Sequence, residues 1–372
     1  MKEEYLHHIW KMKRLPWQML RLTDGRPLIV NHVGNYNANE NGPDFQQGCV
    51  TIDGIKWYGS IELHVKSSDW FKHKHQTDKN YDNVVLHVVY QDDVPVFVNN
   101  QKIPTLELKS FIDEAHFRQY QHWQTEKTTF PCKPFFASLP SPYFLNMQTR
   151  ALHQRLNRKT NFLDNYAPWE ALCLLAARAI GKNLHQDNFM FIVQEPIAQE
   201  IRTENYSLWE EKILFIKSEL ETKKLLLWKT KGNRPSKNDM EILTLLSFQL
   251  LNKIHFEPQD ELFENIKQLW SKILDELQIK QGILFQNLQI NAFIPWLYWM
   301  SEKFNRGDWY DYFYDELANL PKENNRITRL WEKHLCSIEN AAQSQSVIEI
   351  YKQFCMPKRC LECTIGNKIM NP

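Results

Sequence analysis

Apolar residues in the first third of the chain occur in short alternating runs, the pattern of β-strands. The runs PLIVNHVG, CVTI, IKWYGSIELHV and NVVLHVVY begin at residues 27, 49, 55 and 83, and VFVN and PTLELK follow from residue 96. Asp53-Gly54 separates the second run from the third, as expected for a tight hairpin turn. Helical spacing at residues 3–22 precedes these strands, so residues 1–125 predict a mixed α/β domain built on a sheet.

From residue 145 onwards the apolar spacing changes to that of amphipathic helices. Six windows have this spacing: Leu145–Leu163, Pro168–Gly181, Trp209–Leu227, Ser236–Ile254, Asp260–Leu277 and Ile290–Phe304. The intervening residues 126–144 contain four prolines and predict a linker. We expect an α+β protein with a sheet domain (1–125), a proline-rich linker (126–144), an all-α domain (145–350) and a Cys-rich tail (351–372).

Composition indicates a folded protein without a strong overall charge. Of its 372 residues, 43% are hydrophobic and 24% are charged, and the formal net charge is +1. This composition provides enough apolar material for a core and excludes a global positive field that would attract nucleic acid. The first residues, MKEEYLHHIW, lack the apolar stretch of a signal peptide, and no apolar run is long enough to span a membrane. We therefore expect a cytoplasmic location and no membrane association.

The strand SIELHVKS concentrates the chemistry of the first domain. Side chains alternate across a strand, which places Glu62, His64 and Lys66 on the face opposite the apolar residues. Asp44 precedes the neighbouring strand of the hairpin and is expected to approach the same face. Two carboxylates suit Mg²⁺ or Mn²⁺, and a neighbouring His or Lys can orient or deprotonate water. The alternative interpretation is a solvated strand face with a cross-strand pair.

Pro43-Asp44 followed by Glu62-Leu63-His64 resembles the Pro-Asp…Glu-x-Lys signature of the PD-(D/E)XK nuclease superfamily. The resemblance implies a restriction-endonuclease-like sheet and metal-dependent cleavage of DNA or RNA. It also implies that Asp44 and Glu62 hold the metal and that His64 or Lys66 handles water or phosphate. The sequence departs from the signature because His64 stands at the lysine position. This departure favours a rival function, a non-catalytic nucleic-acid- or protein-binding scaffold that keeps a nuclease-like sheet.

A histidine-rich segment, SSDWFKHKHQTDKNYDNVVLHVVY, follows the strand and contains His73, His75 and His87. Imidazoles at this density are typical of Zn²⁺ or Mn²⁺ sites. We predict that His73 and His75 join Asp44 and Glu62 around one metal. Two alternatives remain: a surface loop without a metal, or hydrolysis of a small phosphate or ester that depends on His73 and His75. His87, within a strand, is also typical of a hydrogen-bonded core residue.

Three cysteines in the tail, Cys355, Cys360 and Cys363, have the spacing C-x4-C-x2-C. This spacing predicts a structural Zn²⁺ site or an iron–sulfur cluster that attaches the tail to the rest of the chain. Three residues are candidates for a fourth ligand: Cys132, Cys336 and His334. Some PD-(D/E)XK nucleases join a C-terminal cysteine group to a distant upstream cysteine, so that resemblance favours Cys132.

Basic clusters are the main sequence feature that favours DNA or RNA as a partner. They comprise Arg150, Arg155, Arg158 and Lys159; Lys223, Lys224, Lys229, Lys231, Arg234 and Lys237; and Lys358 and Arg359. Such clusters contact phosphates in some proteins and form solvated helix faces in many others. The sequence does not indicate a protein partner.

Four segments together resemble an uncharacterised bacterial family, domain of unknown function 2851. They are GPDF at 42–45, GSIELHVKSSDW at 59–70, the segment from His73 to YDNVVLHVVY at 73–90, and CxxxxCLECTIGN at 355–367. The resemblance spans nearly the full chain and implies no activity, substrate or catalytic residue.

Overall fold

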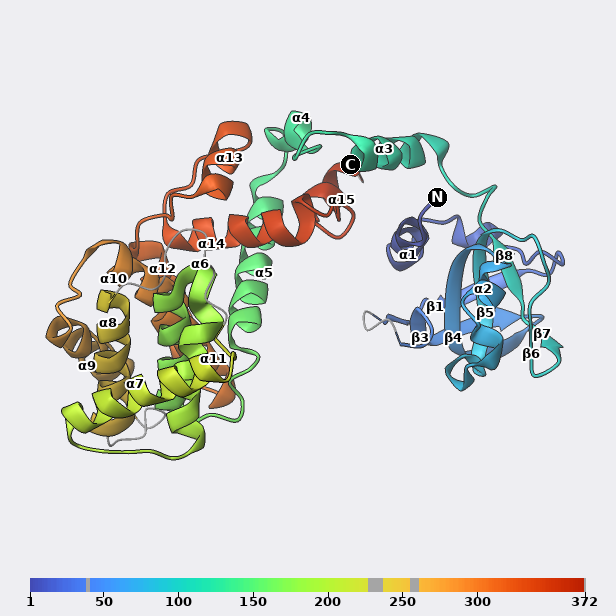
Figure 1. Cartoon of the computed structure of the whole chain (residues 1–372). Coiled ribbons are helices and arrows are strands. Elements are labelled where there is room, and N and C mark those ends of the chain that lie inside the picture. The colour runs from blue at the N-terminus through green and yellow to red at the C-terminus, as the bar shows by residue number, and fades with distance from the viewer. Residues whose placement is uncertain (38–40, 227–236, 255–260, 371–372) are drawn as a thin grey trace. The chain divides into compact units, whose positions relative to one another are not determined.

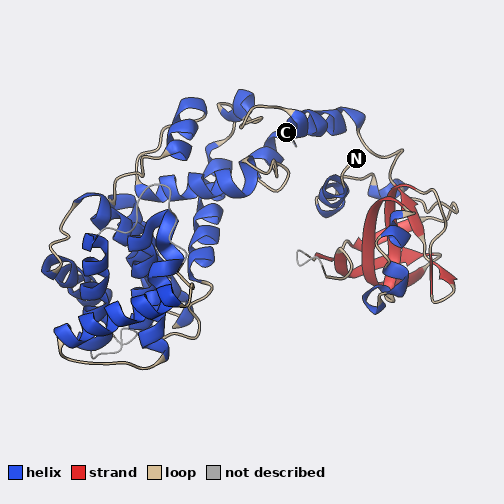
Figure 2. Ribbon diagram, viewed as in Figure 1, coloured by secondary structure: helices blue, strands red, loops and turns tan. Residues whose placement is uncertain are grey.

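A computed structural model describes all residues except 38–40, 227–236, 255–260 and 371–372. The chain divides into two compact units (Figure 1). Unit 1 comprises residues 1–135 and 355–372, and unit 2 comprises residues 136–354. The strands of the main sheet belong to unit 1, and the described part of unit 2 is predominantly helical (Figure 2). The predicted α+β class is confirmed, and the tail belongs to the same unit as the N-terminal sheet.

Unit 1 begins with helix α1 and then builds a sheet. Its elements are α1 (Glu3–Lys11), β1 (Leu28–His32), β2 (Asn35–Tyr36), β3 (Phe45–Ile52), β4 (Ile55–Lys66), α2 (Asp69–Lys72), β5 (Val84–Gln91), β6 (Phe97–Val98), β7 (Gln101–Lys102), β8 (Thr105–Glu107), α3 (Glu114–Thr125) and α15 (Thr364–Met370). The short helix α4 (Lys133–Phe136) lies where the chain passes into unit 2.

The main sheet is mixed. Its strand order is β1-β3-β4-β5-β8, with β2 paired to β3. Strands β1, β3 and β4 are antiparallel neighbours, whereas β5 runs parallel to β4 and β8 runs parallel to β5. A parallel pair needs a crossover, and residues 67–83, which contain α2, supply it between β4 and β5.

The hairpin predicted at Asp53-Gly54 is confirmed. Asp53 and Gly54 have φ angles of 52° and 78°, so both central turn residues are left-handed, as a two-residue turn between twisted strands requires. The turn sets the register from Ile52 opposite Ile55 to Gly48 opposite Gly59, and an irregularity between Gly48 and Phe45 then shifts it by one residue, so that Phe45 lies opposite Ile61.

Two apolar clusters hold unit 1 together on opposite faces of β4. Ile61 and Leu63 lie in the larger one, where Leu6 and Trp10 of α1 and Trp123 of α3 are also buried. The smaller cluster contains residues of the crossover, of β5 and of the chain beyond β5: Trp70, Tyr81, Val84, Val96 and Ile103. Residues 60–64 of β4 are therefore buried on both faces, whereas the first four residues of the strand are exposed.

The helix predicted over residues 3–22 is wrong beyond Lys11. After α1 the chain turns at Lys13, which has a φ of 53°. A short 3-10 helix, η1 (Trp17–Met19), follows Pro16. Proline lacks the N–H that a continuing helix would need, so the apolar spacing of residues 15–20 belongs to a separate packed segment.

The helical windows predicted for unit 2 all contain helices, with shifted ends. Its helices are α5 (Ser141–Thr160), α6 (Pro168–Ala198), α7 (Tyr206–Thr222), α8 (Lys237–Phe248), α9 (Phe263–Glu276), α10 (Gly282–Leu288), α11 (Ile294–Lys303), α12 (Tyr310–Asn319), α13 (Arg326–His334) and α14 (Ala341–Ile350). Helix α6 is interrupted at Lys182, where φ is 52°. None of the described helices is long and apolar enough to cross a membrane.

Candidate metal site

Glu62 and His64 of β4 lie inside unit 1. They are 4% and 1% exposed, because Trp70 and Tyr81 of the crossover lie over this face of the sheet. A solvated strand face is therefore the wrong interpretation for these two residues. Buried polar groups need partners, and the partners of this pair define the site.

Asp44 lies beside Glu62. The register pairs Phe45 with Ile61. Asp44, which immediately precedes β3, therefore stands opposite Glu62 of β4. The backbone N–H of Asp44 donates to Oε2 of Glu62 at 3.0 Å, and Oδ2 of Asp44 accepts from the N–H of Leu63 at 2.9 Å. The two carboxyl groups thus meet at one edge of the polar face of β4.

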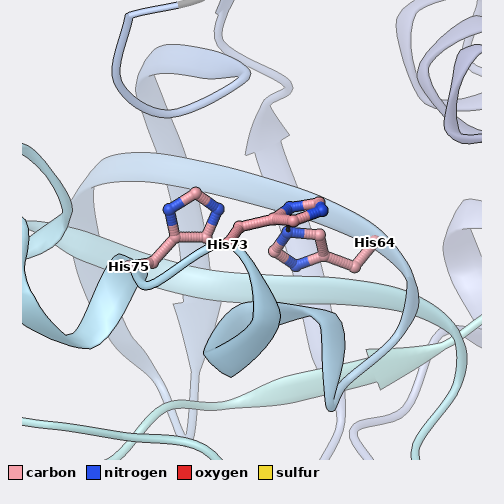
Figure 3. A group of neighbouring side chains, drawn as sticks. All are labelled: His64, His73 and His75. Atoms are coloured by element: carbon pink, nitrogen blue, oxygen red, sulfur yellow. Dashed lines mark hydrogen bonds between the residues drawn. The ribbon is translucent and has the colours of Figure 1, made fainter.

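Three imidazoles lie close together (Figure 3), and two of them lie beside Glu62. They belong to His64 of β4, to His73 after α2 and to His75, which opens the 3-10 helix η2 (His75–Thr77). One ring nitrogen of each lies within 4.8 Å of the other two. Oε1 of Glu62 is 3.3 Å from Nε2 of His75 and 3.6 Å from Nε2 of His64. Four potential metal donors therefore converge from β4 and the crossover.

The crossover is shaped to return its histidines to the sheet. Lys74 has a φ of 64°, which turns the chain between His73 and His75. The ring of His75 then stacks on that of Tyr81, with centroids 3.8 Å apart. His73 remains exposed, whereas His75 is largely enclosed.

His87 of β5 orients His64. Nδ1 of His64 lies 2.8 Å from Nε2 of His87, and Nε2 of His64 lies 3.2 Å from Nδ1 of His73. In the tautomer with its proton on Nδ1, His64 donates to His87 and turns its Nε2 lone pair toward Glu62 and His73. A histidine that donates one ring N–H to a partner while offering the other nitrogen is the usual arrangement of a metal ligand.

Burial makes these groups neutral in the metal-free protein. Burial and the neighbouring Asp44 carboxylate raise the pKa of Glu62 to about 9. Burial and the surrounding imidazoles lower the pKa of His64 to about 2. The pKa of His87 is lowered to about 3, mainly by burial and to a smaller extent by His75. The 3.6 Å contact between Glu62 and His64 is therefore not an ion pair. A cation would reverse this balance, because it stabilises an ionised carboxylate beside neutral imidazoles.

The donor set fits a transition metal. Nε2 of His75 is buried and has no hydrogen-bond partner in the described part of the chain, although Oε1 of Glu62 lies only 3.3 Å away. An unsatisfied buried nitrogen costs about 1–3 kcal/mol, which a bound metal would offset. Three imidazoles with a carboxylate suit Mn²⁺ or Zn²⁺ better than Mg²⁺, which prefers oxygen ligands.

Helix α1 contributes two residues that the sequence analysis did not identify. Nε2 of His7 lies 3.2 Å from Oδ2 of Asp44. Although burial opposes it, the neighbouring Asp44 carboxylate raises the pKa of His7 above its ordinary value. Burial raises the pKa of Glu3, which also feels the charges of His73 and Asp44. Glu3 and His7 are four residues apart, so they share one helix face, and this spacing was the available sequence signal.

The side chain of Lys66 does not contact Glu62 or the three histidines. Its side chain is exposed and forms no ion pair or hydrogen bond with another described residue. Its backbone N–H instead donates to Oδ2 of Asp69 at 3.0 Å, near the start of α2. The lysine of the nuclease signature therefore has no counterpart among the contacts of Glu62.

The four cysteines predicted as metal ligands belong to unit 1. Cys132 precedes α4, and Cys355, Cys360 and Cys363 precede α15. The other candidates for a fourth ligand, His334 and Cys336, belong to unit 2. Sγ of Cys336 accepts a hydrogen bond from Nε1 of Trp331 at 3.3 Å.

Three basic residues of α5 have internal partners. Arg155 donates to Oε1 of Gln345 at 2.6 Å, and Arg158 donates to both carboxylate oxygens of Glu349 at 3.1 and 2.6 Å. Lys159 donates to Oδ1 of Asn291 at 2.7 Å. These contacts do not support a phosphate-binding role for this cluster. In the second cluster, Lys229, Lys231 and Arg234 lie outside the described residues.

Comparison with known proteins gives a family and no activity. A family model described as protein of unknown function (DUF2851) matches residues 3–237, more than half of the chain. No curated protein and no solved structure matches the chain. The match includes Asp44, Glu62 and the three histidines and stops before the cysteine tail. The chain belongs to the DUF2851 family of proteins of unknown function.

Proposed function

We propose that unit 1 is a metal-dependent phosphodiester hydrolase that binds its cation through Glu62, His64, His73 and His75. The observation that carries the proposal is that nitrogens of three imidazoles lie within 4.8 Å of one another, and that two of these rings, those of His75 and His64, lie 3.3 and 3.6 Å from Oε1 of Glu62. Of the two cations predicted for the Asp44–Glu62 carboxylates, Mg²⁺ and Mn²⁺, Mn²⁺ fits this donor set better.

The arrangement of strands supports a phosphodiester as the substrate. A helix, an antiparallel meander of three strands and a parallel strand reached by a crossover succeed one another in unit 1. Asp44 stands at the start of the second meander strand and Glu62 on the third. The PD-(D/E)XK resemblance implies this element order and these positions for its carboxylates.

Each group near the proposed cation has a role in this scheme. A bound metal ion would lower the pKa of water and neutralise charge that develops on a phosphate. Asp44 and His7 form the pair that accepts and holds a proton, because His7 lies 3.2 Å from the Asp44 carboxylate and its pKa is raised. His87 is a positioning residue, since it contacts only the far nitrogen of His64.

The test is cleavage of labelled single- and double-stranded DNA and RNA by the full chain with Mn²⁺, Zn²⁺ or Mg²⁺. Metal-dependent cleavage is expected, strongest with Mn²⁺. Glu62→Gln and His75→Ala should each lower cleavage at least ~100-fold, because each removes a metal ligand. Calorimetric titration with Mn²⁺ reports binding separately from turnover.

Two variants provide matched controls. Lys66→Ala removes a charge from the same strand without removing a contact of Glu62, and His122→Ala removes an exposed imidazole of α3 that pairs with Glu126. Both should keep cleavage within about two-fold, as expected for surface substitutions. Cleavage that survives in Glu62→Gln, or that falls equally in Lys66→Ala, contradicts the proposal.

A second candidate is a scaffold that binds nucleic acid or protein without turnover. The exposed Lys66, without a contact to Glu62, favours it, because the lysine of the signature is then unavailable to the reaction. Tight Mn²⁺ or nucleic-acid binding without cleavage would support the scaffold. Hydrolysis of small phosphate esters but not of nucleic acids would instead identify a small-molecule hydrolase dependent on His73 and His75.

A further inference from the structure

The chain joins the two units twice, and cysteines lie at both places. It leaves unit 1 after residue 135 and returns at residue 355. Cys132 precedes the first boundary by three residues, and Cys355 is the first residue after the second. Cys360 and Cys363 follow in the turns before α15.

The two cysteine segments are held together within unit 1. Lys358 bridges them, since its carbonyl accepts a hydrogen bond from Nε2 of Gln124 in α3 at 2.8 Å and its ammonium donates to the carbonyl of Thr128. Cys132 and Cys360 pack against the same apolar cluster as the sheet, next to the buried Leu361. Helix α15 packs against α3. Segments distant in the sequence thus become neighbours around the thiols.

The tail turn is built for close packing at the thiols. A Cβ at Gly366 would lie 2.2 Å from the carbonyl oxygen of Cys360, a distance that no side chain tolerates. The carbonyl of Cys363 accepts the N–H of Asn367 at 2.7 Å, and the N–H of Cys363 donates to Arg359 at 3.3 Å. Gly366 therefore permits the approach of α15 that brings Cys360 and Cys363 to one side of the tail.

The thiols of the two segments are reduced and at least partly buried. Cys363 is buried, and Cys132, Cys355 and Cys360 are partly buried. The cysteines form no disulfide. Four thiols that two neighbouring segments bring into one unit are an arrangement that a metal cation would stabilise.

We infer that Cys132, Cys355, Cys360 and Cys363 hold a metal centre through four thiolates, independently of the histidine site. Cys132 is the fourth ligand, because it shares a unit with the three tail cysteines and its segment is joined to the tail through Lys358. The centre would fix the end of the first segment of unit 1 to the start of its second.

The spacing of the sulfurs favours an iron–sulfur cluster over a single zinc. Among the described residues, the histidine triad is the one group of three or more His, Cys, Asp or Glu whose ligand atoms all lie within 4.8 Å. Four sulfurs around one Zn²⁺ with bonds of 2.3 Å would be only about 3.8 Å apart. A multinuclear cluster accepts thiolates that are more widely spread.

The test is the metal content of the full chain purified without a tag under anaerobic conditions. Iron with an equal amount of acid-labile sulfide and a visible charge-transfer band is expected for a cluster, and about one zinc per chain for a single ion. Cys132→Ser and Cys360→Ser should each lower this metal at least ~10-fold. The control, Cys336→Ser, should retain it, because that thiol is bonded to Trp331 in unit 2.

Two further measurements separate this centre from the histidine site and from misfolding. His75→Ala should keep the cysteine-bound metal in full. Mass spectrometry after alkylation of the native wild-type chain should find these four thiols protected together and released together when the metal is removed. The inference would be overturned if the protein remained metal-free after iron and sulfide, or zinc, had been supplied. Equal losses in Cys336→Ser and Cys132→Ser, or four thiols alkylated at the same rate with and without metal, would overturn it too.

Discussion

Two buried glutamates, one in each unit, have pKa values shifted in opposite directions. Glu349 of α14 is 1% exposed. Although burial alone would raise its pKa, the hydrogen bonds and charges of Arg158 and Arg155 lower it below the ordinary value. Glu62, 4% exposed, faces neutral imidazoles and a second carboxylate, and its pKa is raised to about 9.

The two pKa shifts differ because the charge of Glu349 is compensated within the fold and that of Glu62 is not. Glu349 receives hydrogen bonds from both guanidinium groups, so its charge is compensated within the fold. Glu62 lacks a permanent cation among its described contacts, which are His64, His75 and the N–H of Asp44. In the proposed function, a bound cation would supply the compensating charge.

The largest effect is expected from Glu349→Ala. The substitution leaves Arg155 buried and without its carboxylate partner, and breaking a buried ion pair in this way costs about 3–5 kcal/mol. Urea denaturation followed by far-UV circular dichroism should record the lower free energy of unfolding. Glu332→Ala, which removes a solvent-exposed salt bridge with Lys322, is the control and should change stability far less than Glu349→Ala does.

A smaller effect is expected from His87→Phe. Loss of the hydrogen bond to His64 Nδ1 should weaken Mn²⁺ binding about 10–100-fold, the usual result of removing a partner of a metal ligand. Calorimetric titration measures the affinity, and His122→Phe on the surface of α3 is the matched control. Unchanged Mn²⁺ affinity in the His87 variant would argue against His64 as a ligand.

Glu62→Gln should raise the free energy of unfolding, whereas Glu349→Ala lowers it, when stability is measured with a chelator present. The native state must keep Glu62 protonated while the unfolded chain ionises it, so the wild-type residue destabilises the metal-free fold near pH 7. Replacement by the neutral amide should raise the free energy of unfolding by about 1–2 kcal/mol. A loss of stability comparable to that in Glu349→Ala would show that Glu62 is a structural residue.

The smallest effect is the pH dependence of the stability changes that substitutions of Glu62 and Glu349 produce. The raised pKa of Glu62 makes the advantage of Glu62→Gln grow as pH rises from the unfolded value of about 4.5 toward about 9. The lowered pKa of Glu349 means that its stabilisation is complete above its unfolded pKa and lost as pH falls through its folded pKa.

Unfolding curves of the wild type, Glu62→Gln and Glu349→Gln at several pH values separate the two windows. Each glutamate contributes a slope of at most about 1.4 kcal/mol per pH unit. The comparison between the units would be reversed if the stability difference between Glu349→Gln and the wild type varied most at alkaline pH. It would also be reversed if the difference between Glu62→Gln and the wild type were confined to acidic pH.

Much of the sheet was predictable because its signals are local. Asp53-Gly54 fixed the hairpin, and the two-residue alternation of β4 put Glu62 and His64 on one face. The sequence signals for the site were incomplete because the site depends on contacts between segments that are distant in the sequence. The relevance of Glu3 and His7 depends on where α1 packs against the sheet, and a pairing between β3 and β4 brings Asp44 to Glu62.

The sequence by itself determined the α+β class, the hairpin, the helical second half and the set of side chains able to bind metals. Those features follow from propensity and periodicity, which act over a few residues. Only the tertiary structure decided that Glu62 and His64 are buried, that Lys66 lies apart, and that Cys132 shares a unit with the tail. Such outcomes depend on the packing of distant segments, where desolvation and paired charges, rather than local spacing, determine the state of each group.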